Sequence, residues 1–88
     1  MFKETGKYLK AKRIEIGITQ TELQHFLGYG GKNGYVSRVE MGRAMYGVSR
    51  LKRIIPKLNL NSSYLIELYC RDVLEITKKK LGKLKKIT

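Results

Sequence analysis

The chain has 88 residues, and its 19 lysines and arginines against 7 acidic residues give a formal net charge of +12 at pH 7. This length accommodates one domain, and so large a positive excess indicates a polyanionic partner. Hydrophobic residues make up 42% of the chain, too many for a disordered polycation. A single cysteine and a single histidine exclude an internal disulfide and a structural zinc site, and we expect neither a metal nor another cofactor.

No apolar run approaches the roughly 20 residues of a membrane-spanning helix, and the first residues lack the apolar segment of a signal peptide. The sequence therefore predicts a cytoplasmic protein that does not enter a membrane. Because only one small domain fits in this length, we expect no separate ligand-binding domain and no small-molecule ligand.

Apolar residues recur with helical spacing in five segments that glycine or asparagine separates, which predicts an all-α fold. The predicted helices cover residues 5–16, 20–27, 33–41, 49–58 and 62–79. Gly17 suits the left-handed backbone that often ends a helix, and Thr19 and Glu22 have the spacing of a capping box. Pro56 should kink the fourth helix or end it near Ile55, because proline lacks a backbone N–H. The expected caps of the third, fourth and fifth helices are Asn33, Ser49 and Ser62.

The positive charge is concentrated at the C-terminus. Residues 78–88 carry six lysines and no acid, whereas residues 1–77 carry 13 basic and 7 acidic residues. We therefore divide the chain into a domain of residues 1–77 and a basic C-terminal tail of residues 78–88. The tail is either a solvated end or an arm that lies along phosphates.

Two short helices joined by a glycine-bearing turn, as predicted for residues 20–27 and 33–41, form the arrangement that places a helix in the DNA major groove. Val36 and Val39 are three positions apart, so we expect both to face inward while Ser37 and Arg38 face outward.

Several short sequences occur together around this pair of helices. They are Arg13 near the end of the first helix, Thr19-Gln20 opening the second, Leu27-Gly28 closing it, and Ser37-Arg38-Val39-Glu40-Met41-Gly42 ending the third. Over about residues 5–66 the chain thereby resembles the phage repressor and Cro family of helix-turn-helix transcriptional regulators. It departs from the family in its turn, which has six residues between Tyr29 and Val36 instead of about four. The resemblance implies a single five-helix domain that binds double-stranded DNA.

The resemblance also implies roles for individual residues. The base-reading positions are Asn33, Gly34, Tyr35, Ser37 and Arg38. Thr19 and Gln20 are expected to contact phosphates at the start of the second helix, and Lys32 and Arg43 flank the third helix and suit phosphates better than bases. Arg13 and Glu40 are expected to form a structural ion pair. Three of the base-reading residues have an alternative role: Asn33 as a helix cap, Tyr35 as packing against the turn, and Arg38 as the partner of a surface acid.

A single module of this size buries too little DNA surface to be selective, so we expect a homodimer that reads an inverted repeat. A two-fold axis would place the recognition helices about 34 Å apart, one turn of duplex. The expected dimer interface on the long last helix is Leu65, Leu68, Tyr69 and Val73. Alternatively, these residues only close the core of the monomer.

No catalytic site is expected. The acidic residues are scattered along the chain, and Cys70 is predicted to be a small core residue without a histidine partner. The expected function is transcriptional regulation, as in phage repressors and Cro proteins, in controller proteins of restriction-modification operons, or in antitoxins that repress their own operon. One alternative is a sequence-tolerant DNA- or RNA-binding protein in which charge dominates. Another is an antitoxin-type module whose main partner is a protein.

Overall fold

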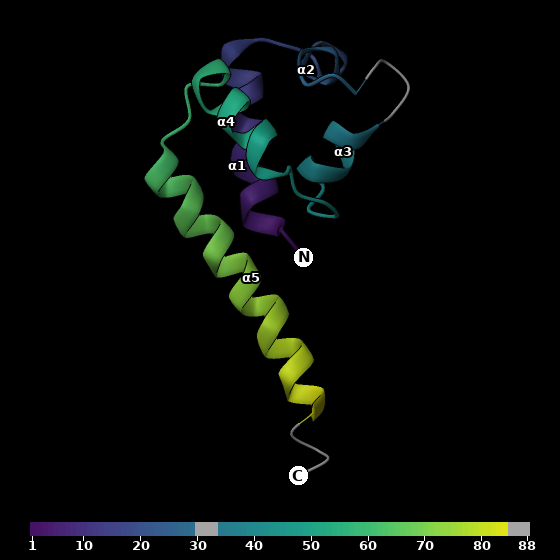
Figure 1. Cartoon of the computed structure of the whole chain (residues 1–88), viewed down its shortest axis with the longest axis vertical. Coiled ribbons are helices and arrows are strands. Elements are labelled where there is room, and N and C mark those ends of the chain that lie inside the picture. Colours follow the sequence, from purple (N-terminus) through teal and green to yellow (C-terminus); the bar gives the residue numbers. More distant parts are fainter. Residues whose placement is uncertain (30–33, 85–88) are drawn as a thin grey trace.

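A computed structural model describes residues 1–29 and 34–84, except for the side chains of Lys83 and Leu84. Over these residues the protein is all-α, as predicted, and no strand is present. The helices are α1 (Lys3–Ile16), α2 (Gln20–Phe26), α3 (Tyr35–Glu40), α4 (Val48–Lys57) and α5 (Ser62–Leu84). The first four form a body, and α5 runs along one side of it and then projects beyond it (Figure 1).

The core lies among α1 to α4 and the first part of α5. Val36 and Val39 are fully buried, as their spacing predicted. They meet leucine and isoleucine side chains from the other helices and the aromatic ring of Tyr46. The buried cluster is Leu9, Leu23, Leu27, Val36, Val39, Tyr46, Ile54, Leu58, Leu60 and Leu65.

The capping signals of α1 and α2 are confirmed. Gly17 has a φ of 88° at the C-terminus of α1, a left-handed conformation that suits glycine. At the start of α2, Thr19 Oγ1 accepts from the N–H of Glu22 at 3.1 Å, and Glu22 Oε1 accepts from the N–H of Thr19 at 3.1 Å. The hydrogen bond from the Thr19 backbone, with a second from its side chain, lowers the pKa of Glu22.

Two of the predicted caps are wrong. Gly47 precedes α4 without a side-chain hydrogen bond, and the helix already begins at Val48, so Ser49 does not cap it. Asn61, rather than Ser62, caps α5, because the backbone N–H of Tyr64 donates to Asn61 Oδ1 at 3.0 Å. The third predicted cap, Asn33, lies outside the described residues.

Pro56 does not end α4 near Ile55, because the helix continues to Lys57. The proline lies in the last turn of the helix, where a missing N–H removes only one hydrogen bond. The end of α5 also differs from the prediction, since the helix continues past residue 79 to Leu84. Lysine is a good helix former and is favoured near a helix C-terminus, so the first part of the basic tail is helical.

Asp72 on α5 caps the start of α1, which has no cap of its own. Its buried carboxylate accepts from the N–H and the hydroxyl of Thr5 at 2.8 and 2.7 Å, and from the N–H of Glu4 at 3.3 Å. These hydrogen bonds fasten α5 to the body.

Replacing Asp72 with alanine is expected to lower the free energy of unfolding by about 2 kcal/mol, because two backbone donors and a buried hydroxyl lose their acceptor. Urea unfolding measures the loss. Glu75→Ala, which removes an exposed carboxylate one turn along the same helix, is the matched control and should change stability by less than about 0.5 kcal/mol. Equal losses in the two variants would show that the cap does not stabilise the fold.

Candidate nucleic-acid interface

The helices α2 and α3 lie in contact on the side of the body away from α5 (Figure 1). Because the side chains of Val36 and Val39 are fixed in the core, the rotation of α3 about its axis is also fixed. Ser37 is half-buried and Arg38 is exposed on the outer side of the helix.

An ion pair joins α1 to α3. Arg13 Nε lies 2.6 Å from Glu40 Oε2, and the second nitrogen, Nη2, lies 3.1 Å from Oε1, so the guanidinium binds the carboxylate with two hydrogen bonds. Arg13 Nη1 also donates to the carbonyl of Ile18 at 2.7 Å. The structure thus brings together the two residues that the family resemblance paired.

Gln20 belongs to the same network. Its Nε2 donates one hydrogen bond to Glu40 Oε1 at 2.9 Å, which orients the side-chain amide at the start of α2. The amide NH2 has a second N–H, so the expected phosphate contact stays a prediction. Thr19 is exposed, and its hydroxyl oxygen accepts from the N–H of Glu22 within the capping box.

Gln24 is a structural residue that the sequence analysis did not identify. It is buried on α2, and its Oε1 accepts from the N–H of Val36 at 3.4 Å, in the first turn of α3. This N–H has no partner within its own helix, so Gln24 supplies an acceptor that Gly34, the residue preceding α3, cannot provide.

Aromatic and basic side chains form a stack at the two ends of the turn between α2 and α3. The rings of Tyr29 and Tyr35 lie 4.7 Å apart at 27°. The guanidinium of Arg50 lies 4.1 Å from the centre of the Tyr29 ring, and that of Arg38 lies 5.4 Å from the Tyr35 ring. Burial raises the pKa of Tyr29.

Tyr35 thus makes the packing contacts that were its alternative role, and its base-reading role stays a prediction. It is half-buried, and its hydroxyl donates to the carbonyl of Met45 at 2.7 Å. Gly34 precedes α3 with a left-handed φ of 68°. Two further expected contacts, Lys32 and Asn33, lie outside the described residues. The outer side of α3 thus presents Ser37 and Arg38, and the exposed Arg43 follows the helix.

Basic residues of α4 cover the C-terminal end of α2. Arg50 Nε donates to the carbonyl of Leu27 at 3.3 Å, and Arg53 Nη2 donates to the carbonyl of Phe26. The Lys57 ammonium lies 4.9 Å from the centre of the Phe26 ring. These cations offset the negative end of the α2 dipole, a role that the sequence analysis missed.

The residues proposed for a dimer interface divide into two groups. Leu65 and Leu68 are each only 4% exposed, so they close the core of the monomer, and their assignment to the interface is wrong. Tyr69 and Val73 are 36% and 40% exposed and remain accessible. Cys70 is also exposed rather than buried, because it lies on a different side of α5 from Leu65 and Leu68.

Comparison with protein-family models, with curated proteins and with solved structures finds no match to this chain. Within residues 1–29 and 34–84, acidic, histidine and cysteine side chains do not gather in a group that could hold a metal ion. None of the helices in the same ranges combines the length and apolar character needed to span a bilayer.

Proposed function

We propose that the protein is a sequence-specific, DNA-binding regulator of transcription whose α3 enters the major groove. The domain would act as a dimer on an inverted repeat, and each copy would read one half-site.

One observation carries the proposal: α3 is fixed from the inside by Val36 and Val39, while Ser37 and Arg38 lie on its outer side. The helix is short, and the two residues on its outer side lie within its first four positions. Arginine binds guanine O6 and N7 with two hydrogen bonds, and serine can bond to several bases.

The distribution of charge supports the same partner. Arg38 and Arg43 are exposed on and just after α3, and the whole chain carries +12. Cations beside a recognition helix bind phosphates of both strands and so fix the helix in the groove, although they do not distinguish one base from another.

Replacing Arg38 with alanine is expected to remove preference at one base pair of each half-site. The loss of a bidentate guanine contact corresponds to about 1–3 kcal/mol, or roughly 5-fold to 150-fold in discrimination. Competition between the preferred duplex and variants with single base changes measures it.

Arg43→Ala is the matched control, because the same side chain is lost at a position suited to phosphate. It should weaken binding to all duplexes alike. It should also reduce the slope of log affinity against log salt concentration by the amount that about one phosphate contact contributes. The assignment fails if Arg38→Ala weakens all duplexes equally while Arg43→Ala removes preference at one position.

A sequence-tolerant nucleic-acid binder is the second candidate, favoured by the lysines at 78, 79 and 80, which extend along the exposed end of α5. In that case removal of residues 78–88 would abolish most of the affinity, and no duplex would be preferred. A specific regulator should instead prefer its site over random duplex by about 10³-fold or more.

A further inference from the structure

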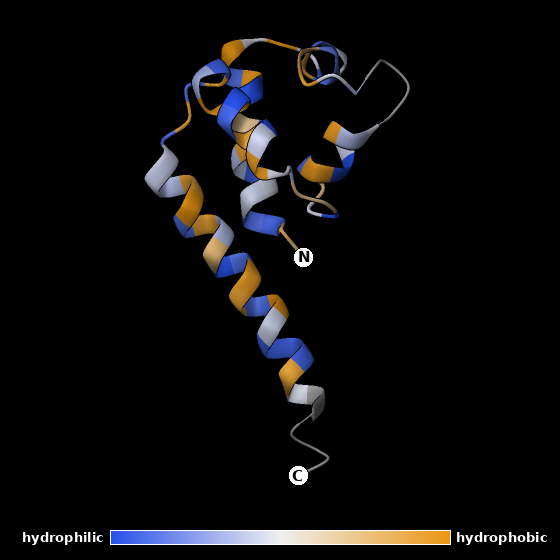
Figure 2. Cartoon of the chain, viewed as in Figure 1, coloured by the Kyte–Doolittle hydropathy of each residue, from blue (hydrophilic) through white to orange (hydrophobic). Residues whose placement is uncertain are grey.

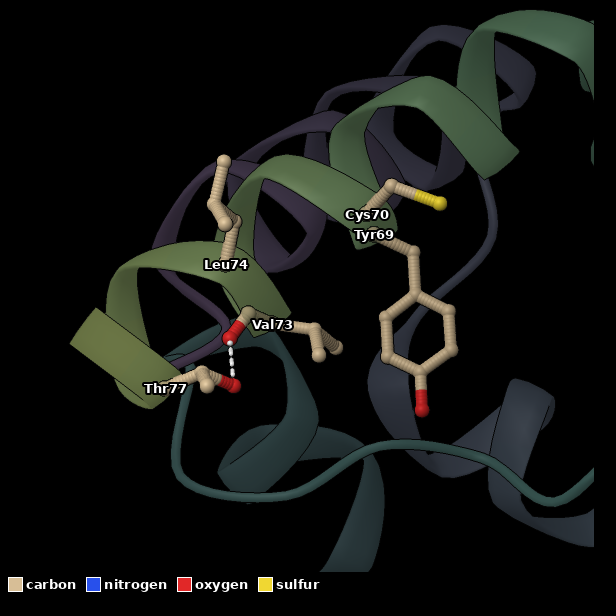
Figure 3. Close-up of a pocket in the computed structure, with 5 residues that line it drawn as sticks. All are labelled: Tyr69, Cys70, Val73, Leu74 and Thr77. Carbon is tan, nitrogen blue, oxygen red and sulfur yellow. Dashed lines mark hydrogen bonds between the residues drawn. The ribbon is translucent and has the colours of Figure 1, made fainter. Parts of the chain in front are cut away.

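α5 carries an apolar stripe that the other described helices do not cover. Ile66, Leu74 and Leu81 are 61%, 53% and 51% exposed, and they lie on one side of the helix with Tyr69 and Val73. Cys70 and Thr77 complete the stripe; the Thr77 hydroxyl donates to the carbonyl of Val73 at 2.8 Å, which satisfies its polar group within the helix. Five of these side chains line one shallow hollow (Figure 3).

The stripe continues into an apolar groove between α4 and α5, which has a volume of about 330 Å³. Val48, Leu51 and Ile55 form the α4 side of the groove, and Ile66 and Tyr69 form the α5 side. Stripe and groove together make one apolar surface, and continuous exposed surfaces of this kind mark interaction sites.

The far half of α5 is only partly covered by the described residues: Met1 lines a hollow with Ile76, but Leu74 and Leu81 are 53% and 51% exposed. It projects beyond the body (Figure 1), yet hydrophobic residues still occur along it (Figure 2). Isolated helices shorter than about 12–15 residues are only marginally stable in water, so this half of α5 would gain stability from a partner that covers Leu74 and Leu81.

The charges on α5 indicate what that partner is. Before its lysines, α5 carries the exposed Glu67 and Glu75 against Arg71 alone, whereas residues 78–88 carry only lysines as charged residues. A third acid, Asp72, is buried against α1 and does not face a partner. Two parallel copies of α5 would bring these lysines together, which is unfavourable. Two antiparallel copies would place the lysines of each copy at the level of Glu67 of the other. Lys52 of α4 also lines the groove, but its ammonium can extend into water, so a partner in the groove does not have to bury this charge.

We propose that a second copy of this chain covers the surface, with its α5 antiparallel and the two-fold axis near Val73. Leu81 of each copy then enters the groove between α4 and α5 of the other, and Ile66 lies opposite Lys80. A two-fold dimer has the symmetry of an inverted repeat. The biological role of the dimer therefore rests on the proposed function.

Sedimentation equilibrium of the full chain tests whether the apolar surface of α4 and α5 binds a second copy. The wild type should have the mass of a dimer, and Val73→Asp should weaken association at least tenfold. Ile14→Asp introduces the same charge at an exposed apolar position of α1, where the side chain is 57% exposed, and should leave the dimer intact. Circular dichroism checks that both variants keep their helices. The inference fails if the wild type stays monomeric up to about 100 µM, or if both variants weaken association equally.

Cysteine cross-linking tests the orientation. Ile66→Cys and Lys80→Cys are each made in the Cys70→Ser background. Mixing the two variants under oxidising conditions should give a disulfide-linked dimer, while neither variant should cross-link alone. Efficient cross-linking of each variant alone, with none between them, would show a parallel pair and overturn the antiparallel arrangement.

Binding to a single half-site separates this inference from the proposed function. If the wild type is a monomer that still prefers one half-site over random duplex, the proposed α5 dimer is ruled out and the proposed DNA recognition stands. If the wild type is a dimer that prefers no duplex, the α5 dimer stands and the proposed function is ruled out.

Discussion

Glu40→Ala is expected to lower the free energy of unfolding by about 3–5 kcal/mol, a large part of the stability of a domain of this size. Arg13 and Glu40 are only 8% and 7% exposed, so removing the carboxylate leaves a buried guanidinium without its counter-ion. Gln20 loses its acceptor at the same time. Urea unfolding followed by circular dichroism measures the loss.

Two comparisons show that the buried pair is the cause. Glu15→Ala removes an exposed carboxylate 3.6 Å from Lys12 on the same helix as Arg13, and it should change stability by less than about 0.5 kcal/mol. The double variant Arg13→Met, Glu40→Leu leaves no unpaired charge and should be more stable than Glu40→Ala. A double variant less stable than Glu40→Ala would contradict this explanation.

Gly6→Ala is expected to lower the free energy of unfolding by about 3 kcal/mol, although alanine is the better helix former. A Cβ at this position would lie 2.5 Å from the carbonyl oxygen of Val39 and 2.9 Å from that of Glu40. Both contacts are with backbone, which cannot rotate away, so α1 and α3 must move apart. Because α3 is the proposed reading helix, the variant should also lose duplex preference.

Gly82→Ala is the matched control, since Gly82 also lies within a helix and a Cβ there would have no atom within 4 Å. It should leave stability unchanged or raise it by up to about 1 kcal/mol. If Gly6→Ala is as well tolerated as Gly82→Ala, the close approach of α1 and α3 is not needed for stability.

The helices could be predicted because each has a local signal. The spacing of Val36 and Val39 predicted the buried side of α3, and Thr19 and Glu22 predicted the start of α2. The end of α5 was not predicted, because a lysine-rich sequence is compatible with both a helix and a solvated end.

Contacts between distant parts of the chain could not be predicted from local signals. Asp72 caps a helix whose first turn lies 67 residues earlier, and nothing in its own neighbourhood indicates this. The stacking of Tyr29 on Tyr35 depends on how the turn closes, although an aromatic residue at each end of the glycine-rich stretch was a usable signal. Cys70 was misplaced because its apolar neighbours belong to two different sides of α5.

Selection of bound duplexes from a random library tests the central claim most directly, because every possible binding site competes in the same experiment. The account predicts enrichment of an inverted repeat whose half-sites are centred about 10 base pairs apart, with preference at one position lost in the Arg38→Ala variant. Duplex binding without enrichment of any sequence would contradict it.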